Sequence, residues 1–216
     1  MPLRNRQPVQ KGTRKSAFFV SAKLKRQQPK ELIYVAFNKP FGVLSQFTTE
    51  LGKRTLAEFK LPEKIYAIGR LDEESEGLLL LTNDDALKHQ LTDPRFEHKK
   101  TYLVQVERVP SESALQQLRD GINVGGLQTR PADVRLLESE PNLIRRPVPI
   151  RFRKSVPTAW LRLTITEGKN RQVRRMTAAV GHPTLRLVRV QIAGLELGNI
   201  HPGEWKRISK DSILKK

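Results

Sequence analysis

The stretch Gly69–Thr82 reads Gly-Arg-Leu-Asp-Glu-Glu-Ser-Glu-Gly-Leu-Leu-Leu-Leu-Thr, an acid-rich loop that leads directly into a run of leucines. A short continuous apolar run is typical of a strand buried on both faces. The loop would therefore place Asp72 at the edge of a core sheet. A carboxylate there can act as a nucleophile or a base, especially if a cation keeps it ionised. By position alone, an aspartate that only caps a turn is the better explanation.

The segments around this stretch predict an α+β fold. We expect strands where β-branched and aromatic residues cluster or alternate, and helices where apolar residues recur at helical spacing. Strands and helices do not alternate strictly, which favours a mixed sheet over a doubly wound one. The expected strands are Leu32–Phe37, Gly77–Thr82, Thr101–Val106, Asp133–Leu137, Trp160–Thr166 and Leu185–Gln191; the expected helices are Asp84–Leu91, a helix capped by Ser111 and ended by a left-handed Gly121, and Arg171–Val180 before Gly181.

Charge indicates the class of partner. Forty Lys and Arg against 22 Asp and Glu give a net charge of +18, which attracts nucleic acid. A basic but inert surface is the alternative. The absence of cysteine excludes disulfides, thiolate metal sites and a cysteine nucleophile. No apolar run is long enough for a membrane span or a signal sequence, so we expect a cytoplasmic protein without a membrane partner.

Two segments stand apart from this pattern. Residues 1–30 contain nine basic residues and no acid, and we expect a disordered tail that either holds RNA or is dispensable. Residues 31–212 would form one domain. Within it, the proline-rich stretch Pro141–Pro157 carries five cations and predicts an exposed basic loop. That loop is a candidate RNA contact, and a merely solvated loop is equally compatible with its sequence.

Basic residues gather at two further places. Glu167–Met176 joins a strand to a helix, and its cations Lys169, Arg171, Arg174 and Arg175 crowd the first turns of that helix. Helix N-termini bind phosphates, and arginine forks bind them in a bidentate manner. An amphipathic helix with a solvated basic face is the alternative. At Lys99–Tyr102 an aromatic ring adjoins two cations, a combination that suits an unpaired base, although a tyrosine in a strand is more often core.

Taken together and in order, four motifs resemble those of the pseudouridine synthases that modify bacterial ribosomal RNA. The matching segments are Asn38–Val43, Gly69–Asp84, Lys100–Tyr102 and Glu167–Met176, so the resemblance covers about Leu32 to Ser209. It implies a mixed, mainly antiparallel sheet with flanking helices, and no separate N-terminal RNA-binding domain. Ser75, Glu73, Glu74 and Asp85 depart from the common pattern, which puts substrate preference in doubt more than reaction type.

The resemblance also implies an activity. The chain would be an isomerase that converts a specific uridine of large-subunit (23S) ribosomal RNA to pseudouridine, as a monomer, with no metal and no cofactor. Asp72 would start the reaction, by attack on the sugar or the base or by removal of a sugar proton. Arg174 would pair with Asp72, Tyr102 would stack on the flipped uracil, and Leu187 would pack against the base or Asp72. The expected RNA contacts are Lys39, Arg70, Lys99, Lys169, Arg171 and Arg175.

Two other functions fit parts of the sequence. A metal-dependent nuclease could use clustered carboxylates to hold Mg²⁺ ions. A non-catalytic protein of ribosome assembly would explain the charge equally well. A methyltransferase is disfavoured, because no glycine-rich turn follows a strand in the way that cradles a nucleotide-like cofactor. The carboxylates of the nuclease hypothesis are Asp72, Glu73, Glu74, Asp84 and Asp85.

Overall fold

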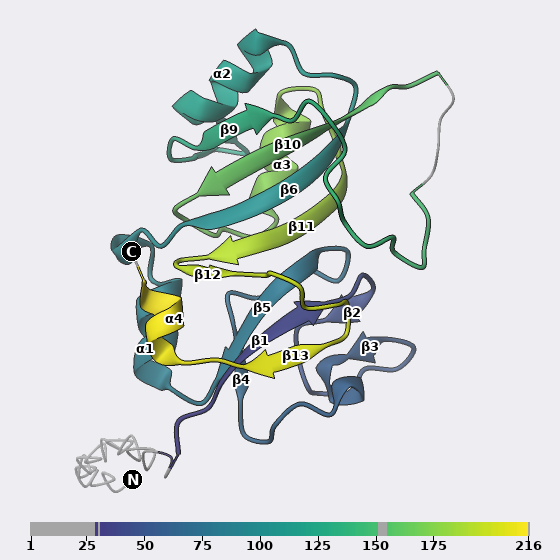
Figure 1. Ribbon diagram of the computed structural model, residues 1–216. Coiled ribbons are helices and arrows are strands. Elements are labelled where there is room, and N and C mark those ends of the chain that lie inside the picture. The colour runs from purple at the N-terminus through teal and green to yellow at the C-terminus, as the bar shows by residue number, and fades with distance from the viewer. Residues whose placement is uncertain (1–28, 30, 151–154, 216) are drawn as a thin grey trace, which may run out of the picture.

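A computed structural model describes residues 29, 31–150 and 155–215, and the predicted basic tail 1–30 therefore lies almost wholly outside the described residues. The described chain is built on a nine-stranded sheet with the order β13-β1-β5-β11-β6-β10-β9, in which β12 pairs with β11 and β4 with β5 (Figure 1). Every pairing in this sheet is antiparallel except that of β5 with β11. The predicted α+β architecture with a mixed, mainly antiparallel sheet is confirmed.

The elements follow the predicted segments closely wherever those segments are long. The sheet strands are β1 (Tyr34–Lys39), β4 (Tyr66–Ile68), β5 (Glu76–Thr82), β6 (Lys100–Glu107), β9 (Asp133–Leu136), β10 (Thr158–Ile165), β11 (Thr184–Ile192), β12 (Leu195–Glu196) and β13 (Trp205–Arg207). Two short pairs lie apart, β2 (Val43–Leu44) with β3 (Arg54–Thr55) and β7 (Asn123–Val124) with β8 (Leu127–Gln128). The helices are α1 (Asp85–Thr92), α2 (Glu112–Asp120), α3 (Gln172–Ala179) and α4 (Lys210–Leu214), with 3₁₀ turns at Leu56–Phe59 and Pro94–Phe96.

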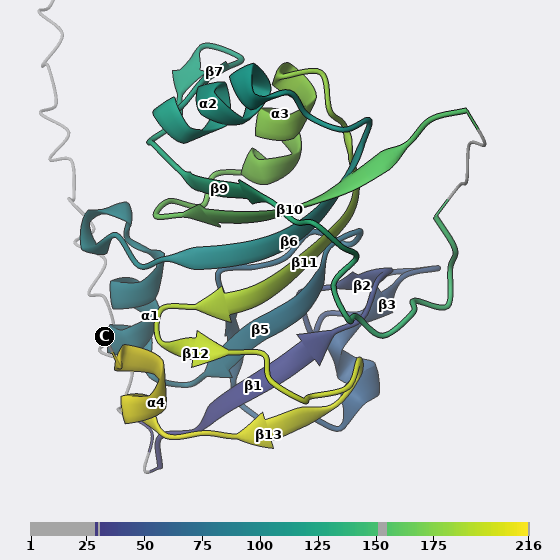
Figure 2. The ribbon, with the colours of Figure 1, turned by 45° about the horizontal axis from the view of Figure 1, so that its top comes forward.

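Helices pack against both faces of the sheet and divide the core in two. One apolar cluster joins α2 and α3 to β6, β10 and one face of β5, and the second joins α1 and α4 to β12 and the other face of β5. Figure 2 shows α2 and α3 together beside β9 and β10, and α1 with α4 on the side of β12. All seven residues of β5 are buried, as expected for a leucine run covered on both faces.

Helix α2 shows which local signals specified its ends. The Ser111 side chain accepts a hydrogen bond from the Ala114 N–H, which satisfies one of the free donors of the first turn. Gly121 ends the helix with φ 85° and ψ 143°, so its φ is positive but it does not adopt the predicted left-handed helical conformation. A Cβ at this position would lie 2.5 Å from the Thr129 carbonyl oxygen, and the close approach of the following chain therefore requires glycine.

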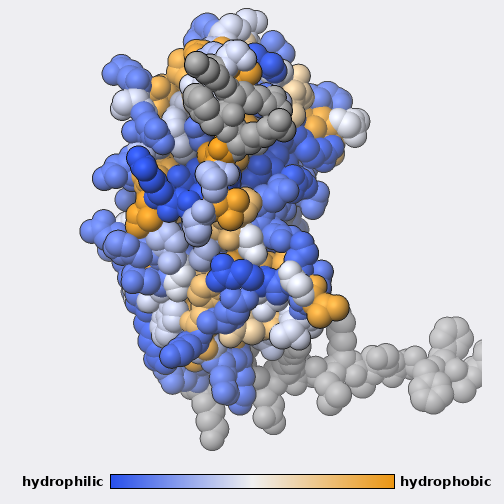
Figure 3. All heavy atoms as spheres, turned by 90° about the vertical axis from the view of Figure 1, so that its right-hand side faces the viewer, coloured by the Kyte–Doolittle hydropathy of each residue, from blue (hydrophilic) through white to orange (hydrophobic). Residues whose placement is uncertain are grey.

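The segment from Pro141 onward lies, as predicted, largely at the surface up to Ile150. It belongs to the long connection between β9 and β10, on a face that is mainly hydrophilic with scattered apolar spots (Figure 3). Arg145 is exposed, whereas the guanidinium of Arg146 stacks over the Phe41 ring at 4.3 Å from the centroid. Arg146 is therefore partly used to hold the loop against the body of the protein.

One edge of β5 is shared by two strands, and this fork shapes the centre of the sheet. β11 pairs with β5 at Glu76 and Gly77, and β4 takes over the same edge at Leu80–Thr82. Between them, the Arg189 side chain donates from Nε to the Leu78 carbonyl and from Nη2 to the Gly69 carbonyl, both at 2.8 Å. Arg189 is only 2% exposed, so water does not reach these carbonyls easily. Its guanidinium therefore supplies the hydrogen bonds that the carbonyls of Leu78 and Gly69 would otherwise lack at the gap between β11 and β4.

Strand β11 approaches β5 so closely at Gly77 that a side chain cannot fit. Gly77 has φ +99°, and a Cβ there would lie 2.3 Å from the Arg189 carbonyl oxygen and 2.8 Å from its nitrogen. Next to this contact, Arg186 of β11 binds the Glu76 carboxylate through Nε at 3.0 Å and Nη2 at 2.9 Å. Both side chains of this bidentate ion pair are buried, and loss of either partner would leave an unpaired buried charge.

Lys39, a predicted RNA contact, lies at the end of β1 next to the fork, inside the protein rather than at its surface. The side chain is fully buried, and its Nζ donates to the carbonyl oxygens of Pro40, Val43 and Glu73. Burial lowers the pKa of Lys39 to about 7, although nearby carboxylates oppose this shift. The chain turns after Pro40, and the carbonyl oxygens of Pro40 and Val43 close over the ammonium group, which explains its burial.

The close approach at Gly77 predicts a large effect of a single methyl group. We expect Gly77→Ala to lower the free energy of unfolding by about 3 kcal/mol or more, because strain at positive φ and a clash with backbone atoms add together. Gly52→Ala is the matched control, since Gly52 has φ +73° and an added Cβ would meet nothing within 4 Å. It should cost only about 1 kcal/mol. Urea denaturation measures both, and equal losses would contradict the close packing of β11 against β5.

Candidate active site

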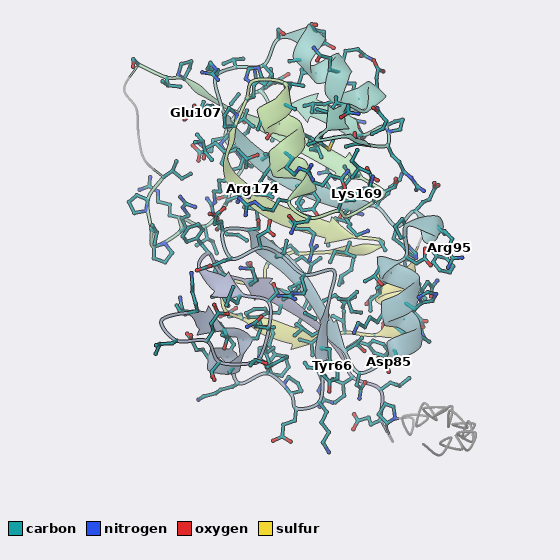
Figure 4. All side chains as sticks on the ribbon, turned by 180° about the vertical axis from the view of Figure 1, so that it is seen from behind. Tyr66, Asp85, Arg95, Glu107, Lys169 and Arg174 are labelled. Carbon is teal, nitrogen blue, oxygen red and sulfur yellow. The ribbon has the colours of Figure 1, made fainter. Side chains whose placement is uncertain are left out.

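A cleft of about 780 Å³ opens beside the loop between β4 and β5. The loop contributes Asp72, β6 contributes Tyr102, β11 contributes Leu187 and Arg189, and the start of α3 contributes Arg171. These residues are far apart in sequence and are brought together because β6 and β11 pair in the sheet and β11 meets β5 at the fork. Figure 4 looks onto the face that carries α3, with Lys169 and Arg174 near the centre of the view.

The loop that carries Asp72 is held by the backbone on both sides of the aspartate. Ser45 Oγ accepts a hydrogen bond from the Leu71 N–H at 3.1 Å and donates to the Leu71 carbonyl at 2.7 Å. The Ser75 N–H donates to the Asp72 carbonyl at 3.1 Å, which closes a turn. Together with the Arg189 contact to Gly69, these bonds position the Asp72 carboxylate, which is 28% exposed, at the cleft. The loop is therefore ordered before any substrate binds.

Among the described residues, Arg171 rather than the predicted Arg174 places a cation within 4.0 Å of Asp72. Arg171 Nη1 lies 3.9 Å from Asp72 Oδ2, while its Nη2 donates to Glu74 Oε2 at 2.9 Å. This hydrogen bond lowers the pKa of Glu74 and raises that of Arg171. Arg171 has left-handed backbone angles just before α3, and its side chain reaches across the cleft entrance.

Arg174, one turn further along, is held by backbone carbonyls. It donates from Nη2 to the Glu74 carbonyl at 2.9 Å and from Nη1 to the Thr184 carbonyl at 3.4 Å. Within the described chain, Arg174 makes no ion pair with Asp72 inside 4.0 Å, and its Nε is buried without a hydrogen bond. Burial lowers the pKa of Arg174. Arg174 thus fastens α3 to the loop that carries Asp72 instead of pairing with the Asp72 carboxylate.

Tyr102 and Leu187 contribute to the apolar lining of the cleft, together with residues such as Ile165 and Val173. Tyr102 and Leu187 lie on the neighbouring strands β6 and β11 and are 7% and 5% exposed, respectively. Both belong to the larger core cluster, so their positions are set by packing as well as by the sheet. A flat ring and an aliphatic side chain beside a carboxylate can receive a nucleobase on an apolar surface while its sugar faces the carboxylate.

The chain between β10 and α3 is organised by the buried carboxylate of Glu167. It accepts hydrogen bonds from the Arg130 N–H and from Gln172 Nε2, and Lys169 Nζ lies 3.2 Å away. Burial opposes the charge on Glu167, but these partners outweigh it and lower the pKa of the carboxyl. Gln172 also accepts from the Lys169 N–H, so the turn that presents Lys169 and Arg171 to the cleft is rigid.

Besides the buried Lys39, the other five expected RNA contacts divide into three groups. Arg70, Lys169 and Arg171 line the cleft. Lys99 is exposed on the approach to β6 without lining the cleft. Arg175 points toward the β7–β8 hairpin, where its Nη2 donates to the Val124 carbonyl at 2.7 Å. The structure therefore places Arg175 away from the cleft.

Three residues of the site were missed in the sequence. Arg189 and Ser45 hold the backbone of the loop that carries Asp72. Lys100 lines the cleft, and its Nζ donates to the His98 carbonyl at 3.1 Å. Burial, and secondarily the charge of Arg189, lowers the pKa of Lys100 to about 8. Lys100 stood in a recognised motif but was not assigned a role. No local pattern identifies Arg189 or Ser45, because their partners lie on other strands.

The carboxylates of the nuclease hypothesis are not arranged to share a metal ion. Asp84 caps α1 through the Leu87 N–H and accepts from Tyr34 and Lys210, and Glu73 pairs with Lys53. Across residues 31–150 and 155–215, the structure contains no group of three or more His, Asp or Glu side chains placed to bind a metal. The geometry gives this hypothesis no support. Among the described helices, none is both long and apolar enough to cross a bilayer.

Comparison with known proteins agrees with this geometry. Residues 33–179 match the family model described as RNA pseudouridylate synthase. Ribosomal large subunit pseudouridine synthase E from Xanthomonas campestris pv. campestris is 59% identical over 80% of this chain and 93% of its own length. The protein of the same name from Vibrio vulnificus is 51% identical over 82% of this chain and 76% of its own.

A solved structure extends the match to three dimensions. The structure described as "Crystal structure of pseudouridylate synthase" superposes with a TM-score of 0.69 at 28% identity, covering 85% of this chain and 73% of its own. The matched family region contains Asp72, Tyr102 and Arg174, and ends before Leu187. The chain belongs to the RNA pseudouridylate synthase family.

Proposed function

We propose that this protein isomerises a uridine of large-subunit ribosomal RNA to pseudouridine, with Asp72 as the catalytic residue. The observation that carries the proposal is the position of Asp72, held at the cleft by Ser45 and Arg189 and 3.9 Å from the guanidinium of Arg171. The substrate class is supported by the names of the Xanthomonas and Vibrio relatives. With such a substrate we expect the chain to act in the cytoplasm, as a monomer.

The reaction exchanges one bond to the ribose for another. The bond from N1 of uracil to C1′ breaks, the base turns, C5 bonds to C1′, and the proton leaves C5 while N1 gains one. The product is an isomer of the substrate, so no oxidant, metal or cofactor is required for balance. Asp72 can begin the reaction at the sugar, at the base or by removing a sugar proton. In each route its carboxylate must be ionised and accessible, and Arg171 supplies the adjacent positive charge.

The remaining cleft residues would bind and orient the flipped nucleotide. Tyr102 provides a flat ring for the uracil, and Leu187 provides an apolar contact beside it. Removing a base from its stack costs a few kcal/mol, which contacts to the RNA backbone must offset. Arg70, Lys169 and Arg171 line the cleft and are suited to these phosphate contacts, with Lys99 near its edge.

The carboxylate assignment predicts complete dependence on Asp72. We expect the wild type to release tritium from large-subunit ribosomal RNA labelled at uridine C5, with a chelator present throughout. Asp72→Asn removes the negative charge but keeps the shape, and should reduce release by at least about 10³-fold. Its RNA affinity and melting temperature should stay close to wild type. Release that vanishes with the chelator, or that persists in Asp72→Asn, would contradict the mechanism; RNA binding without release would favour an assembly protein.

Arg171, just before α3, and Arg174, within it, should differ in what their replacement impairs. Arg171→Gln removes an exposed cation next to Asp72, and we expect the single-turnover rate to fall by about tenfold with little change in melting temperature. Arg174→Gln leaves carbonyls of Glu74 and Thr184 without their donor, and should lower the free energy of unfolding by about 1–3 kcal/mol. Thermal denaturation and single-turnover assays on both variants separate the roles. A full loss of rate in a stable Arg174→Gln protein would instead make Arg174 the partner of Asp72.

A further inference from the structure

The cleft continues well beyond Asp72. Its lining passes from Gly69 along Ala67 of β4 and reaches Lys88 and Thr92 of α1 and then Pro94. Its volume of about 780 Å³ lies in the upper part of the range of small-molecule sites, roughly 300–1,000 Å³. If one flipped uridine occupies the end near Asp72, the end near α1 remains for the adjoining part of the RNA strand. This step rests on the proposed function.

An exposed aromatic ring, Tyr66, lies beside the α1 end of the cleft, next to the lining residues Ala67 and Lys88. Tyr66 precedes the cleft residue Ala67 and is 49% exposed. Its hydroxyl makes no hydrogen bond to any residue of the described chain. Tyr34 offers a direct comparison, because it pairs with the same residue, Thr82, from the other side of β5, yet its hydroxyl donates to Asp84 at 2.8 Å. Tyr34 is thus integrated into the fold, whereas the Tyr66 ring faces solvent.

A cation lies over this ring. Lys88 Nζ is 5.9 Å from the centroid of Tyr66, and Lys88 also lines the cleft. No carboxylate within the described chain lies inside 4.0 Å of this ammonium group, so its charge is not neutralised by a close ion pair. In Figure 4, Tyr66 appears close to Asp85, at the start of the helix that carries Lys88. Asp85 itself is exposed to solvent.

We propose that Tyr66 and Lys88 form a second RNA subsite, in which a base next to the modified uridine stacks on the Tyr66 ring and a phosphate of the same strand contacts Lys88. A flat ring beside a mobile cation is the combination by which proteins bind unpaired nucleotides without reading their sequence. Tyr66 leads along β4 directly into the loop that carries Asp72, so a strand held here is aligned with the catalytic carboxylate. Stacking at this subsite offsets part of the cost of unstacking the target uridine.

The protein contains a matched aromatic control. Phe96 is also 49% exposed, but its ring packs between His89 and His98, with centroid distances of 6.2 and 6.3 Å. The two rings are therefore equally exposed, but only Tyr66 has a cleft-lining cation, Lys88, over its ring. If exposed rings bind RNA without regard to place, replacement of either residue should have the same effect.

The test is a steady-state comparison by tritium release from labelled large-subunit ribosomal RNA. Tyr66→Ala should raise KM by about tenfold, the effect of losing one stacked base, with kcat within about twofold. Tyr66→Phe keeps the ring and should restore the wild-type KM. Lys88→Gln should raise KM by a few-fold and make binding less sensitive to salt, because one phosphate contact is lost. Phe96→Ala should match the wild type. Tyr66→Leu preserves apolar cover over β4 if Tyr66→Ala proves unstable.

The outcomes distinguish this inference from the function on which it rests. An inactive wild type would overturn the proposed function, and the affinity of a fluorescent single-stranded oligonucleotide for the same variants would still test the subsite. An active wild type with unchanged KM in both Tyr66→Ala and Tyr66→Leu would overturn the subsite alone. So would an equal rise of KM in Phe96→Ala, or failure of Tyr66→Phe to restore binding.

Discussion

The guanidinium of Arg189 occupies the point where one edge of β5 passes from β11 to β4. Through its hydrogen bonds to the carbonyls of Leu78 and Gly69, it joins both strands to β5 where neither completes the ladder. Its own backbone lies against Gly77, which only glycine allows. The two parts of the sheet, β13-β1-β5 and β11-β6-β10-β9, meet at this fork. The position of the side chains on one part of the sheet relative to those on the other therefore depends on this fork.

The loop that carries Asp72 emerges from the same fork, which explains how residues from distant parts of the chain line one cleft. Asp72 belongs to the β5 side, whereas Tyr102, Leu187 and Arg171 belong to the β11 side. Ser45 fixes the loop from a third segment. Because Ser45 and Arg189 contact backbone atoms of the loop, these contacts do not depend on the identity of the loop's own side chains. The departures of Glu73, Glu74 and Ser75 from the family pattern are therefore compatible with an unchanged position of the carboxylate.

Local sequence predicted the elements whose evidence is local. The leucine run of β5 and the Ser111 cap of α2 carry their own signals, and the family motifs identified Asp72 and Tyr102 as candidates. Short strands such as β4 and β13 were missed, because three residues hold too little pattern and are formed by pairing across the sheet. The same reason applies to Arg189. The choice between Arg171 and Arg174 as the neighbour of Asp72 depends on the left-handed backbone turn before α3. The burial of Lys39 depends on how the chain after β1 folds back over its side chain. Neither feature has a local sequence pattern.

The most direct test of this account is the single-turnover rate of Arg189→Lys with saturating enzyme. Lysine keeps the charge, but its single ammonium group cannot donate to the carbonyls of Leu78 and Gly69 together, as the planar guanidinium does. We predict a folded protein with near-normal RNA affinity in which isomerisation slows by about a hundredfold, because a displacement of about 1 Å at the reacting group is enough for such a loss. A folded Arg189→Lys protein with the wild-type rate would show that the hydrogen bonds of Arg189 at the junction of β4, β5 and β11 do not position Asp72.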